Sequence, residues 1–134
     1  MSLILPMFTI VLLTFIVMLL TGRARFRAVK NGLDPRYFKT YTVGNPPEDV
    51  LTTGRHFSNL FEVPVLFYVA CLAAMQLDLH SIWYVGLAWG FVFMRILHAY
   101  IHLTSNHVLK RMRVFSASVV IIMMMWVMLL INCL

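Results

Sequence analysis

Polar and charged side chains recur at helical spacing in two stretches that are otherwise strongly apolar. Arg55, Asn59 and Glu62 are spaced i, i+4, i+7, which at about 100° per residue places them within roughly 60° of arc on one helix face. A second stripe on a later helix consists of Arg95, His98, His102 and Asn106. Because charged groups are costly inside a membrane helix and guanidinium groups bind anions through a bidentate fork, the two stripes indicate a shared anion-binding cavity.

An alternative is that these side chains form only an internal ion-pair network, and Glu62 and Arg95 individually suit such a network. The network explains the whole set less well, because cations at the ends of the helices outnumber the acid. The cations are Arg25, Arg55, Arg95, Arg111 and Arg113, and the acid is Glu62. An excess of inward-facing guanidinium groups favours an external anion.

The histidines raise a rival hypothesis, because His98 and His102 at i, i+4 could ligate a metal ion or contribute to a haem site. No acidic or cysteine side chain adds to this pair, and Arg95 one turn away repels a cation, so the sequence predicts no metal site. The other histidines lie off the two stripes and are expected to be ordinary interfacial residues: His56, His80 and His107.

The elements that must position these stripes are predicted to be membrane-spanning helices. Hydrophobic residues make up 61% of the 134 residues and charged residues 12%, which is too apolar for an ordinary soluble domain. A helix needs about 20 apolar residues to cross the hydrocarbon core. Four stretches qualify, at about residues 3–20, 51–77, 82–103 and 114–134. We therefore predict one all-α domain over residues 1–134, an integral membrane four-helix bundle with its polar site at one end.

Basic residues predict the orientation of the bundle. Lys and Arg concentrate between residues 23 and 39 and between residues 110 and 113, and they are missing from residues 78–81 and from both chain ends. By the positive-inside rule, the first and third connections are cytoplasmic and both termini lie on the non-cytoplasmic side. No nucleic-acid motif accompanies the net charge of +6, so we expect no nucleic-acid partner.

Turn-forming and small residues refine the helix boundaries. The first helix is expected to break near Asn31. Asn45, followed by two prolines and two acids, indicates a capped helix start, and Pro64 is expected to kink the second span. Gly86 and Gly90 form a small-x-x-x-small pair opposite the second stripe, which allows close packing of another helix.

The motif Arg55-x-x-x-Asn59-x-x-Glu62 before Pro64, followed by Arg95-x-x-His98-x-x-x-His102 and then Arg111, resembles the MAPEG family of membrane-associated proteins in eicosanoid and glutathione metabolism. The resemblance covers nearly the whole chain. Characterised members are homotrimers that bind glutathione between neighbouring subunits, at the cytoplasmic half of the membrane. The resemblance therefore implies a glutathione-dependent transferase or peroxidase, with a lipophilic small-molecule substrate that arrives from membrane lipid.

The resemblance also implies roles for single residues. Arg111 looks like the catalytic arginine that stabilises the glutathione thiolate, with Arg113 as the alternative. Arg25 looks like a glutathione contact from the first helix, Arg55 like the ligand of a carboxylate, and Glu62 like a residue near the ammonium group. The implied glutathione-binding set is Arg25, Arg55, Asn59, Glu62, Arg95, His98 and His102.

Three positions depart from the pattern of eicosanoid-type members. Ser58 stands where they often have a second arginine, His102 where they have tyrosine, and Met112 where a serine can follow the catalytic arginine. These changes remove several glutathione contacts and indicate a divergent branch, for which we expect the bacterial inner membrane. The alternative function is a non-catalytic MAPEG-like protein that binds lipid or serves as an accessory subunit of a membrane complex.

Overall fold

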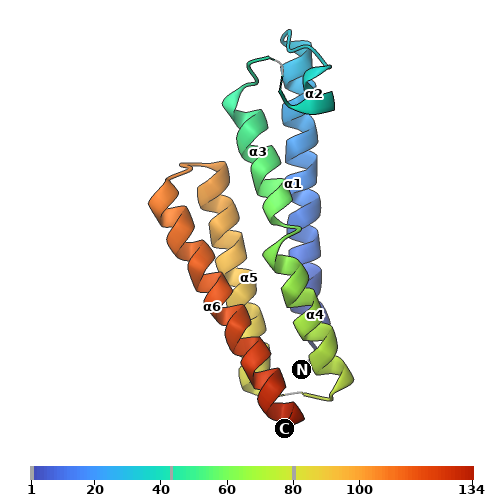
Figure 1. The fold of residues 1–134 in the computed structure, drawn as a ribbon, viewed down its shortest axis with the longest axis vertical. Helices are drawn as coiled ribbons and strands as arrows, with labels where there is room; N and C mark the ends of the chain where they lie inside the picture. The colour runs from blue at the N-terminus through green and yellow to red at the C-terminus, as the bar shows by residue number, and fades with distance from the viewer. Residues whose placement is uncertain (1, 43, 80) are drawn as a thin grey trace.

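Every regular element that the computed structural model describes is a helix (Figure 1), and the description covers residues 2–42, 44–79 and 81–134. The elements in chain order are α1 (Ile4–Lys30), α2 (Tyr37–Thr40), α3 (Glu48–Asn59), α4 (Val63–Gln76), α5 (Ile82–Leu103) and α6 (Val108–Cys133). Four segments of this part of the chain are long and apolar enough to cross a membrane: Ile4–Lys30, Glu48–Gln76, Ile82–Leu103 and Val108–Cys133. The predicted all-α membrane bundle is confirmed.

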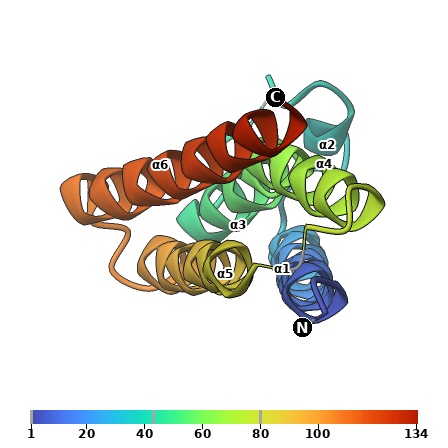
Figure 2. The same cartoon turned by 90° about the horizontal axis from the view of Figure 1, so that it is seen from below.

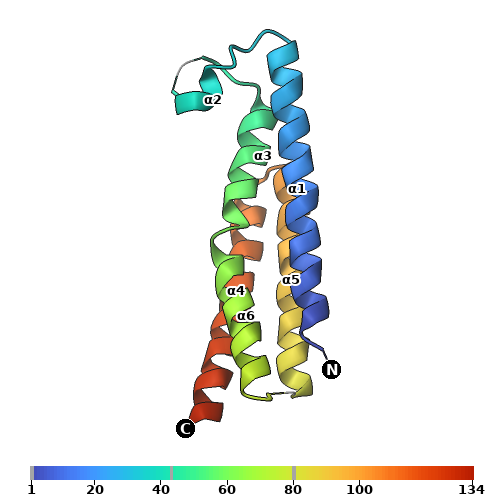
Figure 3. The same ribbon diagram turned by 90° about the vertical axis from the view of Figure 1, so that its right-hand side faces the viewer.

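The four spans form an up-and-down bundle in which α3 and α4 together make one span. Seen along its long axis (Figure 2), the bundle has α1, the α3–α4 span, α6 and α5 at its four corners, and each contacts the next. Both chain termini lie at one end, and the segments that follow α1 and α5 lie toward the other (Figure 3). The two basic connections therefore share one end of the bundle, as the predicted orientation requires; the side of the membrane on which the termini lie stays a prediction.

Aromatic packing and a buried hydrogen bond hold the centre of the bundle. The rings of Phe67 on α4 and Phe91 on α5 stack with centroids 4.4 Å apart and planes at 15°. Nearby, the Tyr84 hydroxyl donates a hydrogen bond to the Ala70 carbonyl over 3.0 Å. Because lipid is as apolar as this core, close packing and interhelical hydrogen bonds, rather than removal from water, stabilise the contact between the spans.

The small-residue prediction for α5 is confirmed at one of its two glycines. A Cβ atom at Gly90 would lie 3.6 Å from Ile121 Cδ1 of α6, whereas a Cβ atom at Gly86 would meet nothing within 4 Å. Gly90 therefore lies at the contact between α5 and α6, where a Cβ atom would be at ordinary van der Waals distance, and Gly86 faces open space.

The predicted break after the first span is confirmed, because α1 ends at Lys30 and Asn31 is its C-cap residue. At the start of α3 the two predicted acids, Glu48 and Asp49, lie in the first turn, but the predicted cap is wrong: Pro47, not Asn45, precedes the first helical residue, and no side chain caps that end. Proline suits the position because its fixed φ of −58° leads directly into the helix and it has no N–H to leave unpaired.

The second span is interrupted rather than simply kinked. Helix α3 ends at Asn59, residues 60–62 form a turn, and α4 begins at Val63 with Pro64 in its first turn. Pro64 has no N–H to donate to the carbonyl four residues earlier, so the helical hydrogen-bond pattern is interrupted and the span restarts there. The interruption leaves Glu62 exposed in the turn before α4 rather than within a regular helix.

Candidate functional site

An open pocket of about 360 Å³ lies where α3, α5 and α6 meet, toward the end of the bundle that carries the basic connections. Its lining residues are Arg55, Asn59, His98, His102, Val108, Arg111, Met112 and Phe115. Among the described residues that line this pocket, two are arginines and none is acidic. The sequence stripes on the second and third spans thus meet, and the pocket they form has a cationic polar part and an apolar part.

Arg95 lies behind the pocket and joins α5 to the end of α3. Its side chain is 0% exposed, and Nη2 donates hydrogen bonds to the side-chain oxygen of Asn59 and, over 3.3 Å, to the Asn59 carbonyl. Since Asn59 is the last residue of α3, that carbonyl lacks a partner within its own helix and carries the negative end of the helix dipole. The Arg95 guanidinium also stands 5.6 Å from the centre of the Phe115 ring, so one cation links three helices.

Arg111 is fixed in the first turn of α6 by two neighbouring side chains. Its Nη1 atom donates to Asn106 Oδ1 over 2.7 Å and lies 3.4 Å from His102 Nε2. Asn106 has a left-handed backbone with φ of 46°, a conformation that asparagine tolerates better than most residues. Arg113 is exposed and does not line the pocket, so of the two arginines that the sequence left open, Arg111 faces it.

Besides Arg95, two more predicted site residues, Arg25 and Glu62, do not line the pocket of their own chain. Arg25 turns toward the α2 segment, where its guanidinium stands 5.5 Å from the Phe38 ring centre and 5.9 Å from that of Tyr41. Glu62 is exposed at the start of α4. The structure therefore brings together Arg55, Asn59, His98, His102 and Arg111, with Arg95 behind them, and leaves Arg25 and Glu62 apart.

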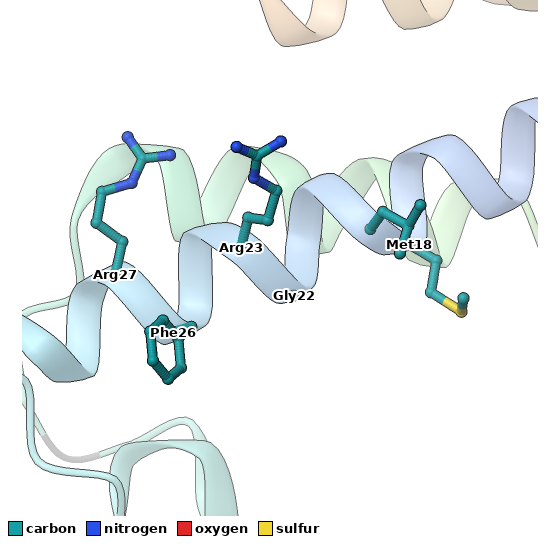
Figure 4. A pocket seen from close by; sticks show the side chains of 6 residues that line it. Met18, Gly22, Arg23, Phe26 and Arg27 are labelled. Carbon is teal, nitrogen blue, oxygen red and sulfur yellow. The ribbon is translucent and has the colours of Figure 1, made fainter.

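The outer face of α1 carries its own basic hollow, separate from the pocket. Figure 4 shows Arg23 and Arg27 extending in one direction from the helix and Phe26 in another. The hollow measures about 650 Å³ and is lined by Met18, Leu19, Gly22, Arg23, Phe26 and Arg27. Arg27 Nη1 lies 3.9 Å from Asp49 Oδ2 of α3, and both side chains are exposed. This surface joins apolar and basic groups, as is typical of a helix at the lipid headgroup level.

His56 is the residue that sequence reasoning missed. It is 0% exposed, and its ring centre lies 5.5 Å from that of His98 and 4.9 Å from that of His102. The expectation of an interfacial residue is wrong for His56, because α3 packs on α5 through the face that carries it. Leu60, an apolar residue four positions later, lies on the same face and was the sequence signal that could have revealed the burial of His56. Leu60 is itself buried. His107 is exposed, and His80 lies outside the described residues.

The model of the MAPEG family matches residues 3–131 of the 134-residue chain, and the chain belongs to the MAPEG family. The resemblance inferred from the motifs is confirmed. No curated protein and no solved structure matches the chain. The family and the four spans define a multi-pass membrane protein related to glutathione and eicosanoid metabolism.

Proposed function

We propose that this protein is a membrane glutathione-dependent transferase or peroxidase that acts on lipophilic electrophiles. The observation that carries the proposal is the pocket where Arg55 and Arg111 line a space with no acidic residue among its described lining. Glutathione has two carboxylates and one ammonium group, so a pocket with two guanidinium groups and the Asn59 amide suits its charge and its hydrogen-bonding groups.

Arg111 is the residue we propose to act on the thiol that glutathione supplies. A guanidinium beside a thiol favours the thiolate, which is the nucleophile. The bond to Asn106 Oδ1 holds Nη1 of Arg111 in place before a ligand arrives, so less ordering is needed on binding. Arg55 lines the same pocket from α3 and is placed to receive a carboxylate.

The apolar part of the pocket suits the second substrate. Val108, Met112 and Phe115 of α6 line it, and Val108 and Met112 are exposed on the molecular surface. An electrophile dissolved in the bilayer therefore has an apolar route to the pocket, while glutathione comes from the aqueous side. In the transferase reaction the thiolate sulfur forms a bond to the electrophilic carbon while the bond from that carbon to its leaving group breaks. The leaving group departs with the electron pair of that bond, and the proton lost from the thiol passes to solvent.

We also propose that the protein forms the homotrimer of its family. Arg25 and Glu62 do not line the pocket of their own chain, so in the implied glutathione site they serve a ligand across a subunit boundary. The solution mass of the detergent-purified protein tests this part separately.

Retention of glutathione by detergent-purified protein tests the proposal. We expect the wild type to bind one glutathione per pocket, and Arg55→Ala to weaken binding at least tenfold, because a charged hydrogen bond contributes about 1.5–3 kcal/mol. Arg36→Ala, at an exposed arginine after α1, is the matched control and should bind like the wild type. If the wild type binds no glutathione, the proposal fails and the non-catalytic lipid-binding or accessory function gains support.

A further inference from the structure

Three histidines from two helices form a buried cluster beside the pocket, and two of them, His98 and His102, also line it. One ring nitrogen from each of His56, His98 and His102 lies within 4.8 Å of one from each of the others, and all three residues are buried. Four of the six ring nitrogens find no hydrogen-bond partner among the described residues: both of His56, Nε2 of His98 and Nδ1 of His102. An unpaired buried polar group costs about 1–3 kcal/mol, so a ligand that pairs these atoms would be strongly favoured.

We propose that His56, His98 and His102 form a binding site for a transition-metal ion of the class that imidazole ligates, with Zn²⁺ as the representative. Neutral imidazole nitrogen suits zinc, copper and nickel. Three histidines are a known zinc-ligand set that leaves a fourth position open. The sequence predicted no metal because no acidic or cysteine side chain joined His98 and His102 and because Arg95 repels a cation; the structure brings His56 to them as a third ligand.

The ring positions are close to what such a site needs. With zinc–nitrogen bonds of about 2.0–2.1 Å, ligand nitrogens in a tetrahedral site lie about 3.4 Å apart. The nitrogens of the cluster lie within 4.8 Å of one another. Side-chain rotations that shorten these distances by about 1–1.5 Å would therefore bring the three nitrogens to tetrahedral zinc-ligand spacing.

Hydrogen bonds outside the cluster set the state of two ligands. His98 Nδ1 lies 3.2 Å from the Arg111 carbonyl oxygen, so Nδ1–H donates to it and Nε2 keeps the lone pair that a metal needs. Metal-bound histidines commonly donate their other N–H to a backbone carbonyl in this way. His102 Nε2 instead faces the Arg111 guanidinium. For His102 to bind the metal through Nδ1, its ring proton must move from Nδ1 to Nε2, and the Arg111 guanidinium must move away from Nε2. The Asn106 oxygen still holds Arg111 when that happens.

The charges around the cluster have opposite effects on a cation. Arg95 and Arg111 repel a cation and weaken its binding. His102 also lines a pocket of about 350 Å³ that contains Glu48 and Asp49 at the start of α3. Carboxylates at the mouth of a pocket raise the local concentration of cations, so this acidic pocket is the route that we assign to the metal.

Calorimetric titration with Zn²⁺ tests the site in the full chain, purified in detergent with a histidine-free affinity tag and without glutathione. We expect one Zn²⁺ per chain in the wild type, at least a hundredfold weaker binding in His56→Ala, and unchanged binding in His107→Ala, whose histidine is exposed. The site is refuted by a wild type that binds no Zn²⁺ at this ratio, or by His56→Ala binding like the wild type.

Arg111→Gln provides a test that does not depend on removing a ligand. This change removes a charge that repels the metal and the guanidinium that occupies His102 Nε2. Zn²⁺ should therefore bind at least tenfold more tightly, and equal or weaker binding contradicts the proposal. If His56→Ala does not fold, Co²⁺ added to the wild type decides, because nitrogen ligation gives visible absorption bands and their absence refutes the site. Each measurement omits glutathione, so failure of the metal site and failure of the proposed function are separate results.

Discussion

Replacing Asn59 with leucine should destabilise the protein because Asn59 is the main hydrogen-bond partner of a buried charge. Arg95 is 0% exposed, and its Nη2 atom donates to the Asn59 side chain and carbonyl, while Nε and Nη1 find no partner among the described residues. Asn59→Leu removes the side-chain acceptor and leaves only the 3.3 Å bond to the carbonyl. Since a hydrogen bond to a charged group contributes about 1.5–3 kcal/mol, we expect the free energy of unfolding to fall by about 2–3 kcal/mol.

Reversible unfolding in mixed detergent micelles, without ligand, measures this change. The matched control is Ser58→Leu, at the exposed neighbouring position of the same helix, which should shift the free energy of unfolding by no more than about 0.5 kcal/mol. Asn59→Asp keeps an acceptor and adds an opposite charge, so it should be at least as stable as the wild type. The reasoning is refuted if Asn59→Leu and Ser58→Leu unfold with the same free energy.

Two further predictions concern the core and the position of Arg111. Phe91→Ala should lower the free energy of unfolding by about 2.4 kcal/mol, because lipid cancels most of the transfer free energy and a cavity of roughly 100 Å³ remains. Phe93→Ala, at a side chain that is 61% exposed, should lower it by less than about 0.5 kcal/mol in the same unfolding assay. Equal losses for the two variants would contradict a lipid-facing Phe93. Asn106→Gly keeps the left-handed turn but removes the acceptor of Arg111, so glutathione affinity should fall about fivefold or more in a binding titration; an unchanged affinity would show that Asn106 does not position Arg111.

Most of the fold could be predicted because lipid imposes simple rules on sequence. Each span needs a long apolar stretch with its backbone paired internally, and the four stretches that meet this rule correspond to the four spans. Pro64 marked the interruption of the second span, although proline alone does not say whether a helix bends or restarts. The prediction of Asn45 as the capping residue was wrong because the two prolines that follow it already determine where α3 begins.

The site could be predicted only where one regular helix carried the residues. Arg55 and Asn59 lie within α3, so their spacing placed both in the pocket, whereas Glu62 lies beyond the end of α3 and the 100° rule no longer applied. Arg25 depends on contacts with Phe38 and Tyr41 in the connection, whose path no periodic pattern reveals. His56 required knowing which face of α3 meets α5.

The account depends most on Arg111 stabilising a thiolate in the pocket between α3, α5 and α6. Ultraviolet absorption of bound glutathione at neutral pH measures the thiolate directly, in the wild type, in Arg111→Met and in Arg113→Met. We predict a thiolate signal in the wild type and in Arg113→Met and its loss in Arg111→Met, because Arg111 lines the pocket and Arg113 does not. A wild type without thiolate, or a signal that Arg113→Met abolishes and Arg111→Met leaves intact, would contradict the account.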